Sequence, residues 1–201
     1  MGAEMRPIRL KFALFVSLVV VFSVAIYGIC VWQEFVFLKP TIQQKYRALW
    51  ISGHSMEPNF HNNDVIILKN INKNYKIKRW DVVSVTHTGF YWDKNLTMPE
   101  DFLKRVVGLP GEELMFNDGK IFARMSPGFF RKVSGNFNRL GCTKFFRIRL
   151  DKNQYFVLGD NRQFSLDSRY FGPIYDFQIN GVEVFRTSNE SLSNIIFNAI
   201  N

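Results

Sequence analysis

Metal ligands are scarce in this sequence, which has only two cysteines and three histidines among 201 residues. Cys30 and Cys142 lie far apart, and Cys30 falls in a hydrophobic segment, so we expect no disulfide between them. His54, His61 and His87 are scattered along the chain, and their spacing matches no zinc motif. The sequence therefore predicts no metal site and no cofactor.

Long hydrophobic runs are equally rare, and the one that stands out lies near the N-terminus. The stretch FALFVSLVVVFSVAIYGICV, residues 12 to 31, contains no charge and has about the length that crosses a hydrocarbon core of ~30 Å as a helix. A cleaved signal peptide would have a shorter apolar core, of ~7–15 residues, ending in a small-x-small site. The run is longer and has no good site, so we expect residues 12–32 to be an uncleaved transmembrane anchor.

The charges around this run predict its orientation. Arg6, Arg9 and Lys11 precede it, and the positive-inside rule then keeps residues 1–11 in the cytoplasm and places residues 33–201 outside. The outer part has a net charge of +7, because only three of the 26 basic and one of the 17 acidic side chains precede it. A basic domain held at a membrane faces anionic head groups, and no DNA or RNA recognition motif is present. Membrane lipid is thus an expected partner and nucleic acid is not.

Beyond the anchor the sequence reads as mostly β. Short runs rich in Val, Ile and Phe alternate with turn residues, as strands do. These runs are RALWIS (47–52), DVIILK (64–69), DVVSVT (81–86), FLKRVVGL (102–109), FFRIRL (145–150) and QYFVLGD (154–160). Helix signals appear only at the end, where SNESLSNIIFNAI (188–200) has apolar residues at helical spacing and Ser188 or Asn189 as a cap.

Residues 117–150 differ from the rest of this domain. They contain eight Lys or Arg, while Asp118 is the only acidic residue among them. The composition indicates an inserted basic subdomain or long hairpin. Contact with a membrane or partner and a solvated surface without such a role both fit this pattern.

The stretch SGHSMEPNF, residues 52–60, contains the first candidate for chemistry. Ser55 follows a short apolar run, at a place where a turn would expose its hydroxyl. A serine hydroxyl needs a base within hydrogen-bond reach to become a nucleophile. His54 is adjacent, but neighbouring side chains of an extended chain point to opposite faces. We therefore expect His54 to be an ordinary surface or core residue and not the base.

Two adjacent cations, Lys104 and Arg105, stand inside the apolar stretch FLKRVVGL. Burying a charge is expensive, and desolvation lowers the pKa of a lysine until it is partly neutral. Arginine stays protonated. If either residue is a base, it is Lys104; the alternative is a lysine that snorkels at a strand edge.

A third polar stretch, GDNRQFSLDSRYFGPI (159–174), lies between two apolar runs. Ser165, Asp167 and Arg169 alternate along it, so an extended chain would place all three on one side. Asp167 and Arg169 are expected to form an ion pair, and Ser165 to donate to a neighbouring group. Taken alone, this stretch would pass for an elaborate loop.

In this order and behind a membrane anchor, these stretches resemble the bacterial type I signal peptidases. The matching pieces are SMEP (55–58), KRVVGLPGE (104–112) and GDNRQFSLDSRYFGP (159–173). The resemblance implies a signal-peptidase-like β fold with a small inserted subdomain. It also implies a serine endopeptidase that removes N-terminal signal peptides from exported preproteins, cutting after small residues through an acyl-enzyme. Such an enzyme sits in the bacterial cytoplasmic membrane by a single span, with its catalytic domain on the extracytoplasmic side.

The resemblance assigns roles to individual residues. Ser55 matches the nucleophile and Lys104 the general base of a Ser/Lys dyad. Ser165 matches a serine whose hydroxyl helps to orient the lysine. Asp167 and Arg169 match a structural ion-pair network, which includes Arg105 in our expectation.

The oxyanion hole implied by the resemblance uses the backbone N–H of Ser55. Some family members add a serine hydroxyl two residues before the nucleophile, where this sequence has Gly53. A side-chain donor is absent there, and a backbone N–H is expected to take its place. Loss of one such donor costs about 2.7–4 kcal/mol when nothing replaces it.

Three other functions remain open from the sequence. A dedicated peptidase that matures a pilin or another client of a conjugation or secretion system would show the same motifs. Self-cleaving repressors of the SOS response share the dyad, but they carry a DNA-binding head in place of a transmembrane run. An inactive membrane-anchored homologue that only binds would have no need to retain Ser55, Lys104 and Ser165 together.

Overall fold

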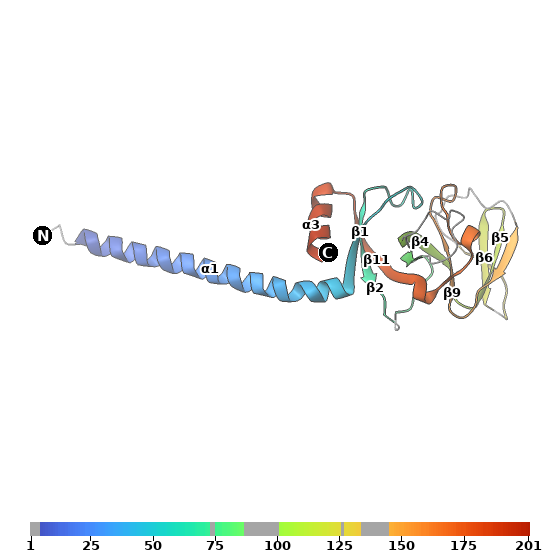
Figure 1. The fold of residues 1–201 in the computed structure, drawn as a ribbon, viewed down its shortest axis with the longest axis horizontal. Coiled ribbons are helices and arrows are strands. Elements are labelled where there is room, and N and C mark those ends of the chain that lie inside the picture. The colour runs from blue at the N-terminus through green and yellow to red at the C-terminus, as the bar shows by residue number, and fades with distance from the viewer. Residues whose placement is uncertain (1–4, 73–74, 87–100, 126, 134–144) are drawn as a thin grey trace, which may run out of the picture. The chain divides into compact units, whose positions relative to one another are not determined.

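The structure is a computed structural model in which the chain forms two compact units, residues 1–44 and 45–201 (Figure 1). The described residues are 5–72, 75–86, 101–125, 127–133 and 145–201. His87 and Cys142 lie outside them.

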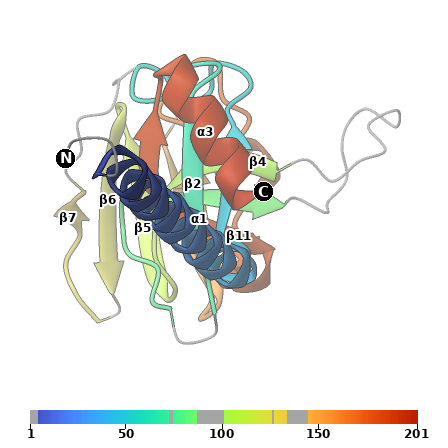
Figure 2. The same ribbon diagram turned by 90° about the vertical axis from the view of Figure 1, so that its left-hand side faces the viewer.

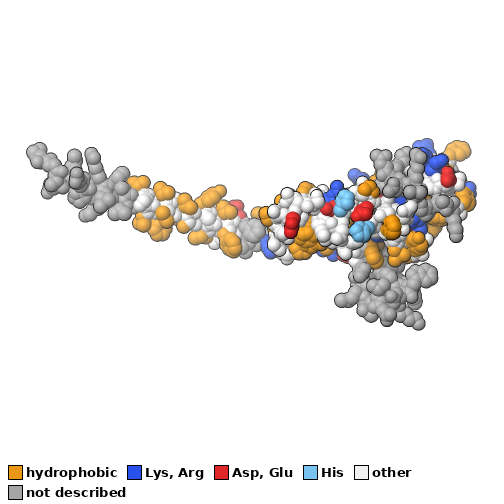
Figure 3. Space-filling view, turned by 90° about the horizontal axis from the view of Figure 1, so that it is seen from above, with side chains coloured by type: hydrophobic (Ala, Val, Ile, Leu, Met, Phe, Trp, Pro, Cys, Tyr) orange, Lys and Arg blue, Asp and Glu red, His pale blue; other side chains and the backbone are white. Residues whose placement is uncertain are grey.

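The first unit is almost entirely one helix, α1 (Met5–Lys45). Its part from Val16 to Lys45 is long and apolar enough to cross a membrane, judged by length and composition. Figure 3 shows hydrophobic side chains along the described part of this helix. Cys30 is exposed on it as a free thiol. The helix contains the whole run expected as an anchor and continues beyond residue 32.

The described residues of the second unit form two antiparallel sheets and three short helical segments, so the mostly β class predicted from the sequence is confirmed. The larger sheet has the strand order β1 (Tyr46–Trp50), β2 (Val65–Asn70), β11 (Ile179–Thr187), β3 (Val82–Thr86), β4 (Asp101–Gly108), β9 (Gln154–Leu158) and β10 (Ile174–Tyr175). The smaller sheet has the order β7 (Arg131–Lys132), β6 (Lys120–Met125), β5 (Glu112–Asn117) and β8 (Phe146–Arg149). The helical segments are α2 (Ser168–Phe171), a 3-10 turn at Asp176–Gln178, and α3 (Glu190–Ile200).

The smaller sheet forms the described part of the expected basic insert. Figure 2 shows β5, β6 and β7 side by side in it. A tight turn joins β5 to β6, with Asp118 and Gly119 both at positive φ, 47° and 67°. The sheet begins at Glu112, before the expected boundary at residue 117, because the apolar residues of β5 alternate inward and pair with β6 along their whole length.

A shared hydrophobic core joins the two sheets where β4 ends. Its fully or nearly buried members are Val107, Leu114, Phe116, Ile121, Ala123, Leu150, Phe156 and Leu158. Gly108 lies at the crossing, where an added Cβ would come within 2.6 Å of Leu114 and 2.8 Å of Phe156. Only a residue without a side chain allows this close approach.

The C-terminal helix α3 packs on the edge strand β1. Its cap is Asn189, whose side chain accepts from the Leu192 N–H at 3.0 Å. Phe197 of α3 meets the ring of Trp50 at 5.7 Å between centroids. The Asn201 side chain donates to the Ala48 carbonyl at 2.9 Å. These contacts fix the position of β1, which is the strand that leads to Ser55.

Candidate active site

Ser55 lies in a turn that follows β1 and is anchored in the core. Met56 and Phe60 of this turn are only 2% and 6% exposed. The Ile51 N–H donates to the Asp64 carbonyl at 2.8 Å, which ties the two ends of the turn together. Ser55 itself is half-buried. The turn thus holds the serine hydroxyl at the end of a strand.

Lys104 reaches Ser55 from β4. The Lys104 Nζ lies 3.0 Å from the Ser55 Oγ, and it donates to the Leu103 carbonyl at 2.9 Å. Lys104 is 2% exposed. The structure therefore brings together the two residues that the sequence matched to a nucleophile and its base, within direct hydrogen-bond reach.

Burial lowers the pKa of Lys104 from 10.5 to about 8. The loss of water around the ammonium group outweighs the carboxylates of Asp167 and Asp160, which act to raise this pKa. With a pKa of about 8, roughly a tenth of the amine is neutral at pH 7, against about 0.04% for a free lysine. The amine can therefore accept a proton near neutral pH.

Two buried ion pairs lie in the segments next to this dyad. Asp167 accepts from Arg169 at 2.7 Å and 2.8 Å. Arg105 forms a forked pair with Asp160, with bonds of 2.8 Å and 2.6 Å. All three residues expected in an ion-pair network are therefore paired, and Arg105 is paired with Asp160.

Ser165 is buried against Gly159. A Cβ added at Gly159 would overlap the Ser165 Oγ and lie 2.5 Å from the Ser55 carbonyl oxygen. Within the described part of the chain, the Ser165 Oγ has no hydrogen-bond partner. The structure thus places Ser165 beside the serine turn without a hydrogen bond to Lys104.

Gly53, expected at the oxyanion hole, has a φ of 93° and donates its N–H to the Asn62 side chain at 3.0 Å. This N–H is therefore directed to Asn62 in the structure. An added Cβ at Gly53 would meet no atom within 4 Å, so the positive φ, and not a lack of space, favours glycine there.

His54 and His61, the two histidines within the described ranges, have carboxylate neighbours outside this arrangement. His54 Nδ1 lies 2.7 Å from a carboxylate oxygen of Glu57, and the His54 side chain is 67% exposed. His61 lies 4.0 Å from Asp64 on an exposed turn. In the ranges that the structure describes, no group of three or more His, Cys, Asp or Glu is placed to hold a metal ion.

A cleft of about 340 Å³ opens beside the dyad. One wall is the end of β1 and the residues after it, Leu49–Ser52, and the other is the beginning of β4, Asp101–Lys104. β1 is the last strand of its sheet, and β4 pairs with β9 only from Arg105 onward. Among the described strands, both walls therefore present unpaired edges to the cleft.

Comparison with known proteins identifies the family to which this site belongs. The family model described as signal peptidase, peptidase S26, matches residues 16–188. The chain belongs to this family. The enzyme class predicted from the sequence, a serine endopeptidase of the signal peptidase I type, is thereby confirmed.

Several relatives of this signal peptidase family member come from bacteria. "Signal peptidase I V" of Bacillus subtilis is 30% identical over 145 residues, which cover 66% of this chain and 80% of the relative. "Probable signal peptidase I-2" of Synechocystis is 30% identical over 129 residues, covering 62% and 55%. A crystal structure of a signal peptidase I from Enterococcus faecalis aligns with a TM-score of 0.40 and 25% identity, over 54% of this chain and 97% of that one.

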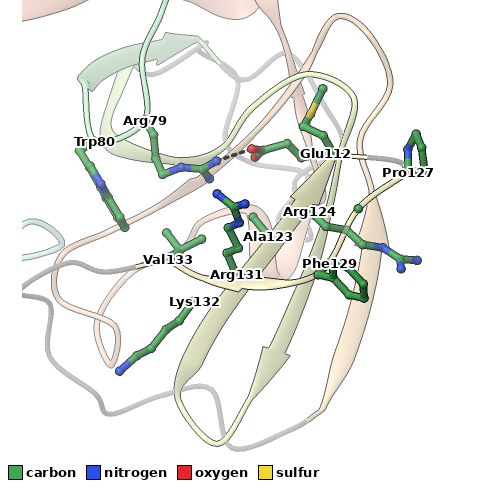
Figure 4. A pocket seen from close by; sticks show the side chains of 12 residues that line it. Arg79, Trp80, Glu112, Ala123, Arg124, Pro127, Phe129, Arg131, Lys132 and Val133 are labelled. Carbon is green, nitrogen blue, oxygen red and sulfur yellow. Dashed lines mark hydrogen bonds and ion pairs between the residues drawn. The ribbon is translucent and has the colours of Figure 1, made fainter.

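A second, larger hollow of about 590 Å³ lies in the smaller sheet of this family member (Figure 4). An ion pair between Arg79 and Glu112 crosses it, and Arg131 points toward that pair. Neither Ser55 nor Lys104 lines it. This hollow is therefore separate from the pair of Ser55 and Lys104.

Sequence reasoning missed the residues that hold the serine turn. Asp160 accepts from the Asn59 side chain at 2.8 Å in addition to its bonds with Arg105. The Asn161 N–H donates to the Ser55 carbonyl at 3.0 Å. Gly159-Asp160-Asn161 reads as a turn in the sequence, and the signal available there was an aspartate directly after an apolar strand. Its partners lie too far along the chain for sequence spacing to reveal them.

Proposed function

We propose that this protein is a membrane-bound serine endopeptidase that removes N-terminal signal peptides from exported proteins, with Ser55 as nucleophile and Lys104 as general base. The distance of 3.0 Å between the Ser55 Oγ and a buried Lys104 Nζ supports this most directly. Preproteins with signal peptides are the substrates. Cleavage occurs after small residues.

The reaction begins with the neutral amine of Lys104. It takes the hydroxyl proton of Ser55 while the Oγ attacks the carbonyl carbon of the scissile bond. The resulting ammonium group gives its proton to the leaving amine, and the signal peptide remains as an ester on Ser55. Water then attacks this ester, with Lys104 taking its proton and returning it to the serine oxygen.

The N–H of Ser55 is the proposed donor to the developing oxyanion. The N–H of Gly53 would become a second donor only if Asn62 released it, because the two are bonded in the structure. Donors that point to the oxyanion before the reaction contribute a large share of catalysis in acyl transfer.

Ser165 is proposed to position the amine of Lys104. A neutral lysine has one lone pair and two N–H groups. In the proposed neutral state the lone pair turns to the Ser55 hydroxyl, whose oxygen accepts from the Lys104 Nζ at 3.0 Å in the structure, and one N–H bonds the Leu103 carbonyl. The second N–H needs an acceptor in this buried site, and the Ser165 Oγ, buried without a partner among the described residues, is suited to supply it.

The substrate is proposed to bind as an additional strand in the cleft. The edges of Leu49–Ser52 and of Asp101–Lys104 offer main-chain groups on either side of it. Side chains at the first and third positions before the cut then face the same wall, because side chains of a strand alternate.

Helix α1 is proposed to anchor the enzyme in the cytoplasmic membrane, with the N-terminus inside and the catalytic domain on the extracytoplasmic side. Its length and apolar composition from Val16 onward support a membrane span. The basic residues that precede Val16 in the sequence support the orientation of this span. Contact of the domain with lipid follows from this tether.

The test is cleavage of preproteins by the detergent-solubilised full chain. Wild type is compared with Ser55→Ala, Lys104→Ala and Lys104→Arg, and with the matched controls Ser188→Ala and Lys76→Arg at exposed positions. Substrates are a general secretory preprotein and a pilin precursor. We expect cleavage after a small residue by wild type and controls, and a loss of at least about 10²-fold in all three dyad variants.

Arginine keeps the charge of Lys104 but cannot become a base. Wild-type activity of Lys104→Arg would therefore contradict the dyad, and wild-type activity of Ser55→Ala would contradict the proposed nucleophile. Cleavage of the pilin precursor alone would narrow the client to a dedicated secretion system.

A further inference from the structure

The hollow in the smaller sheet has more positive charge than its own side chains neutralise. Among the described residues that line it, Glu112 is the one acidic side chain, and four are basic: Arg79, Arg124, Arg131 and Lys132. Arg79 pairs with Glu112, and Arg124 pairs with Glu113 at 2.7 Å. Arg131 and Lys132 are exposed, and within the described ranges neither has a hydrogen bond or an ion pair.

No acidic residue near these two cations in the sequence is available to neutralise them. The stretch from residue 119 to residue 150 contains eight Lys or Arg and no Asp or Glu. Glu112 is 6% exposed, and both of its carboxylate oxygens already accept, one from Arg79 and the other from the Leu109 N–H at 2.8 Å. The two cations are therefore open to an anion from outside the chain.

The sheet places Arg131 inside the hollow. Arg131 of β7 lies directly opposite Ala123 of β6, so both side chains face the same side of the sheet. Both residues line the hollow. The small side chain of Ala123 leaves space beside the longer one of Arg131, which points toward the pair of Arg79 and Glu112 (Figure 4).

The opposite wall of the hollow is fixed by main-chain bonds. Arg79 donates to the Val107 carbonyl in addition to its pair with Glu112. The Trp80 N–H donates to the Val106 carbonyl at 2.8 Å, and the Trp80 carbonyl accepts from Arg105 at 2.9 Å. A ligand would therefore meet a wall that is already formed, and few side chains would have to be ordered when it binds.

The charge and size of the hollow point to a phosphate monoester. The guanidinium fork of arginine matches the oxygens of a phosphate or a carboxylate. A phosphate monoester has a charge of about −1.5 to −2 at pH 7, which suits two cations better than the single charge of a carboxylate. A volume of about 590 Å³ also has room for an organic part. Trp80 and the 93% exposed Phe129 lie on opposite sides of Arg131 in Figure 4.

We propose that this hollow is a binding site for a phosphate monoester, in which Arg131 and Lys132 bind the phosphate group and Trp80 and Phe129 contact the organic part. The site is separate from the peptidase chemistry, since neither Ser55 nor Lys104 lines it. It therefore does not depend on the proposed function.

The experiment is isothermal titration calorimetry at pH 7 and constant ionic strength, with the full chain in a non-ionic detergent. The probes are inorganic phosphate, glycerol 3-phosphate and phenyl phosphate, with acetate as the singly charged control. Wild type is compared with Arg131→Gln, Arg131→Lys and Lys132→Gln. Arg149→Gln is the matched control, because Arg149 is an exposed arginine of the same sheet that does not line the hollow.

We expect saturable binding of phosphate and its esters to wild type and to Arg149→Gln, with phenyl phosphate bound most tightly and acetate least. Arg131→Gln should weaken binding of phenyl phosphate by about 10-fold or more, because a charge-assisted bond is lost. Lys132→Gln should also weaken it. Arg131→Lys should have an intermediate affinity, since it keeps the charge without the fork. If Arg131→Gln does not fold, as judged by thermal unfolding without phosphate, Arg131→Lys and Lys132→Gln still test the site.

A second arm distinguishes a soluble ligand from a lipid head group. The full chain is reconstituted into vesicles of phosphatidylcholine mixed in equal parts with phosphatidic acid, which has a phosphate monoester, or with phosphatidylglycerol, which has a diester. Loss of phenyl phosphate binding with phosphatidic acid alone would identify a lipid head group as the occupant. Equal binding in both vesicles would identify a soluble ester.

The proposal would be overturned by a wild type that gives no saturable binding of phosphate or its esters. It would be overturned equally by an unchanged affinity in Arg131→Gln and Lys132→Gln, or by acetate bound as tightly as phosphate. All of these results leave the peptidase function standing, because none of them measures cleavage.

Discussion

The Asn161 backbone N–H donates to the Ser55 carbonyl at 3.0 Å, and the Asn161 side chain donates to the His54 carbonyl at 3.1 Å. The turn that carries the serine is therefore bonded directly to the loop after β9. That loop also carries Asp160 and leads to Ser165. The position of the nucleophile relative to Lys104 thus depends on a segment more than a hundred residues further along the chain.

Gly159→Ala tests this dependence. The new Cβ would overlap the Ser165 Oγ and lie 2.5 Å from the Ser55 carbonyl oxygen, so the loop and the serine turn must separate. We expect a loss of cleavage of at least about 10²-fold and a lower melting temperature, measured by preprotein cleavage and by thermal unfolding in detergent. In the control Gly28→Ala the new Cβ meets nothing within 4 Å. Gly159→Ala with the properties of the control would refute the proposed contact.

The sequence predicted the residues proposed to react better than it predicted the ion pairs and hydrogen bonds that hold them in place. Lys104 is conspicuous in the sequence, because a cation within an apolar strand needs a reason. Arg105 is equally conspicuous, but its partner Asp160 could not be found from spacing, since 55 residues separate them. The link from Asp160 to Asn59 spans 101 residues. Such pairs are set by tertiary packing.

Two strands show why some of the fold was missed. β11 contains Asn180-Gly181, a dipeptide typical of turns. In the structure the strand runs through it with a shifted register, and a Cβ at Gly181 would come within 3.0 Å of the Lys69 carbonyl oxygen. The glycine is needed for a close approach between strands and not for a turn. In the β5–β6 hairpin, the dipeptide Asp118-Gly119 does form a turn, as this pair of residues commonly does between two strands. The hairpin could therefore be predicted from the sequence.

The pH dependence of cleavage should follow the neutral form of Lys104. Its pKa is lowered to about 8 by burial, so kcat/KM should rise about tenfold per pH unit below pH 8 and level off above it. The measurement is kcat/KM from pH 6 to 9.5 for wild type and for His54→Gln. We expect the two profiles to coincide. A midpoint near 6.5 that disappears in His54→Gln would indicate a histidine base instead.

The buried lysine should also lower the stability of the fold. Between pH 8 and 10.5 the unfolded chain binds a proton at residue 104 that the folded chain does not bind, so stability rises with pH there. Below pH 8 the full cost applies, about 3 kcal/mol for this shift. Lys104→Met should therefore be more stable than wild type at pH 7 by up to about 3 kcal/mol, and this gain should vanish near pH 10.5.

Urea unfolding in detergent at pH 7 and at pH 10.5 measures this difference. Lys76→Met, at an exposed lysine, is the control and should change stability by no more than about 0.5 kcal/mol at either pH. A Lys104→Met variant that is less stable than wild type at pH 7 would show that the lysine contributes more through its contacts than burial costs.

Ser165 and Ser168 allow a positioning role to be separated from a structural one. Both are buried, 5% and 3% exposed. The Ser168 Oγ accepts from the Val157 N–H at 3.0 Å, so Ser168→Ala leaves a buried donor unpaired and should cost about 1–3 kcal/mol of stability. The Ser165 Oγ has no partner among the described residues, so Ser165→Ala breaks no bond of the resting fold.

We therefore expect opposite results from these two variants. Ser165→Ala should unfold like wild type in urea but lose kcat, by about 10-fold or more, because the amine of Lys104 loses an acceptor that keeps its lone pair on Ser55. Ser168→Ala should unfold earlier but keep kcat below its melting temperature. Full kcat in Ser165→Ala, with an unchanged pH profile, would show that Leu103 and Ser55 orient Lys104 without it.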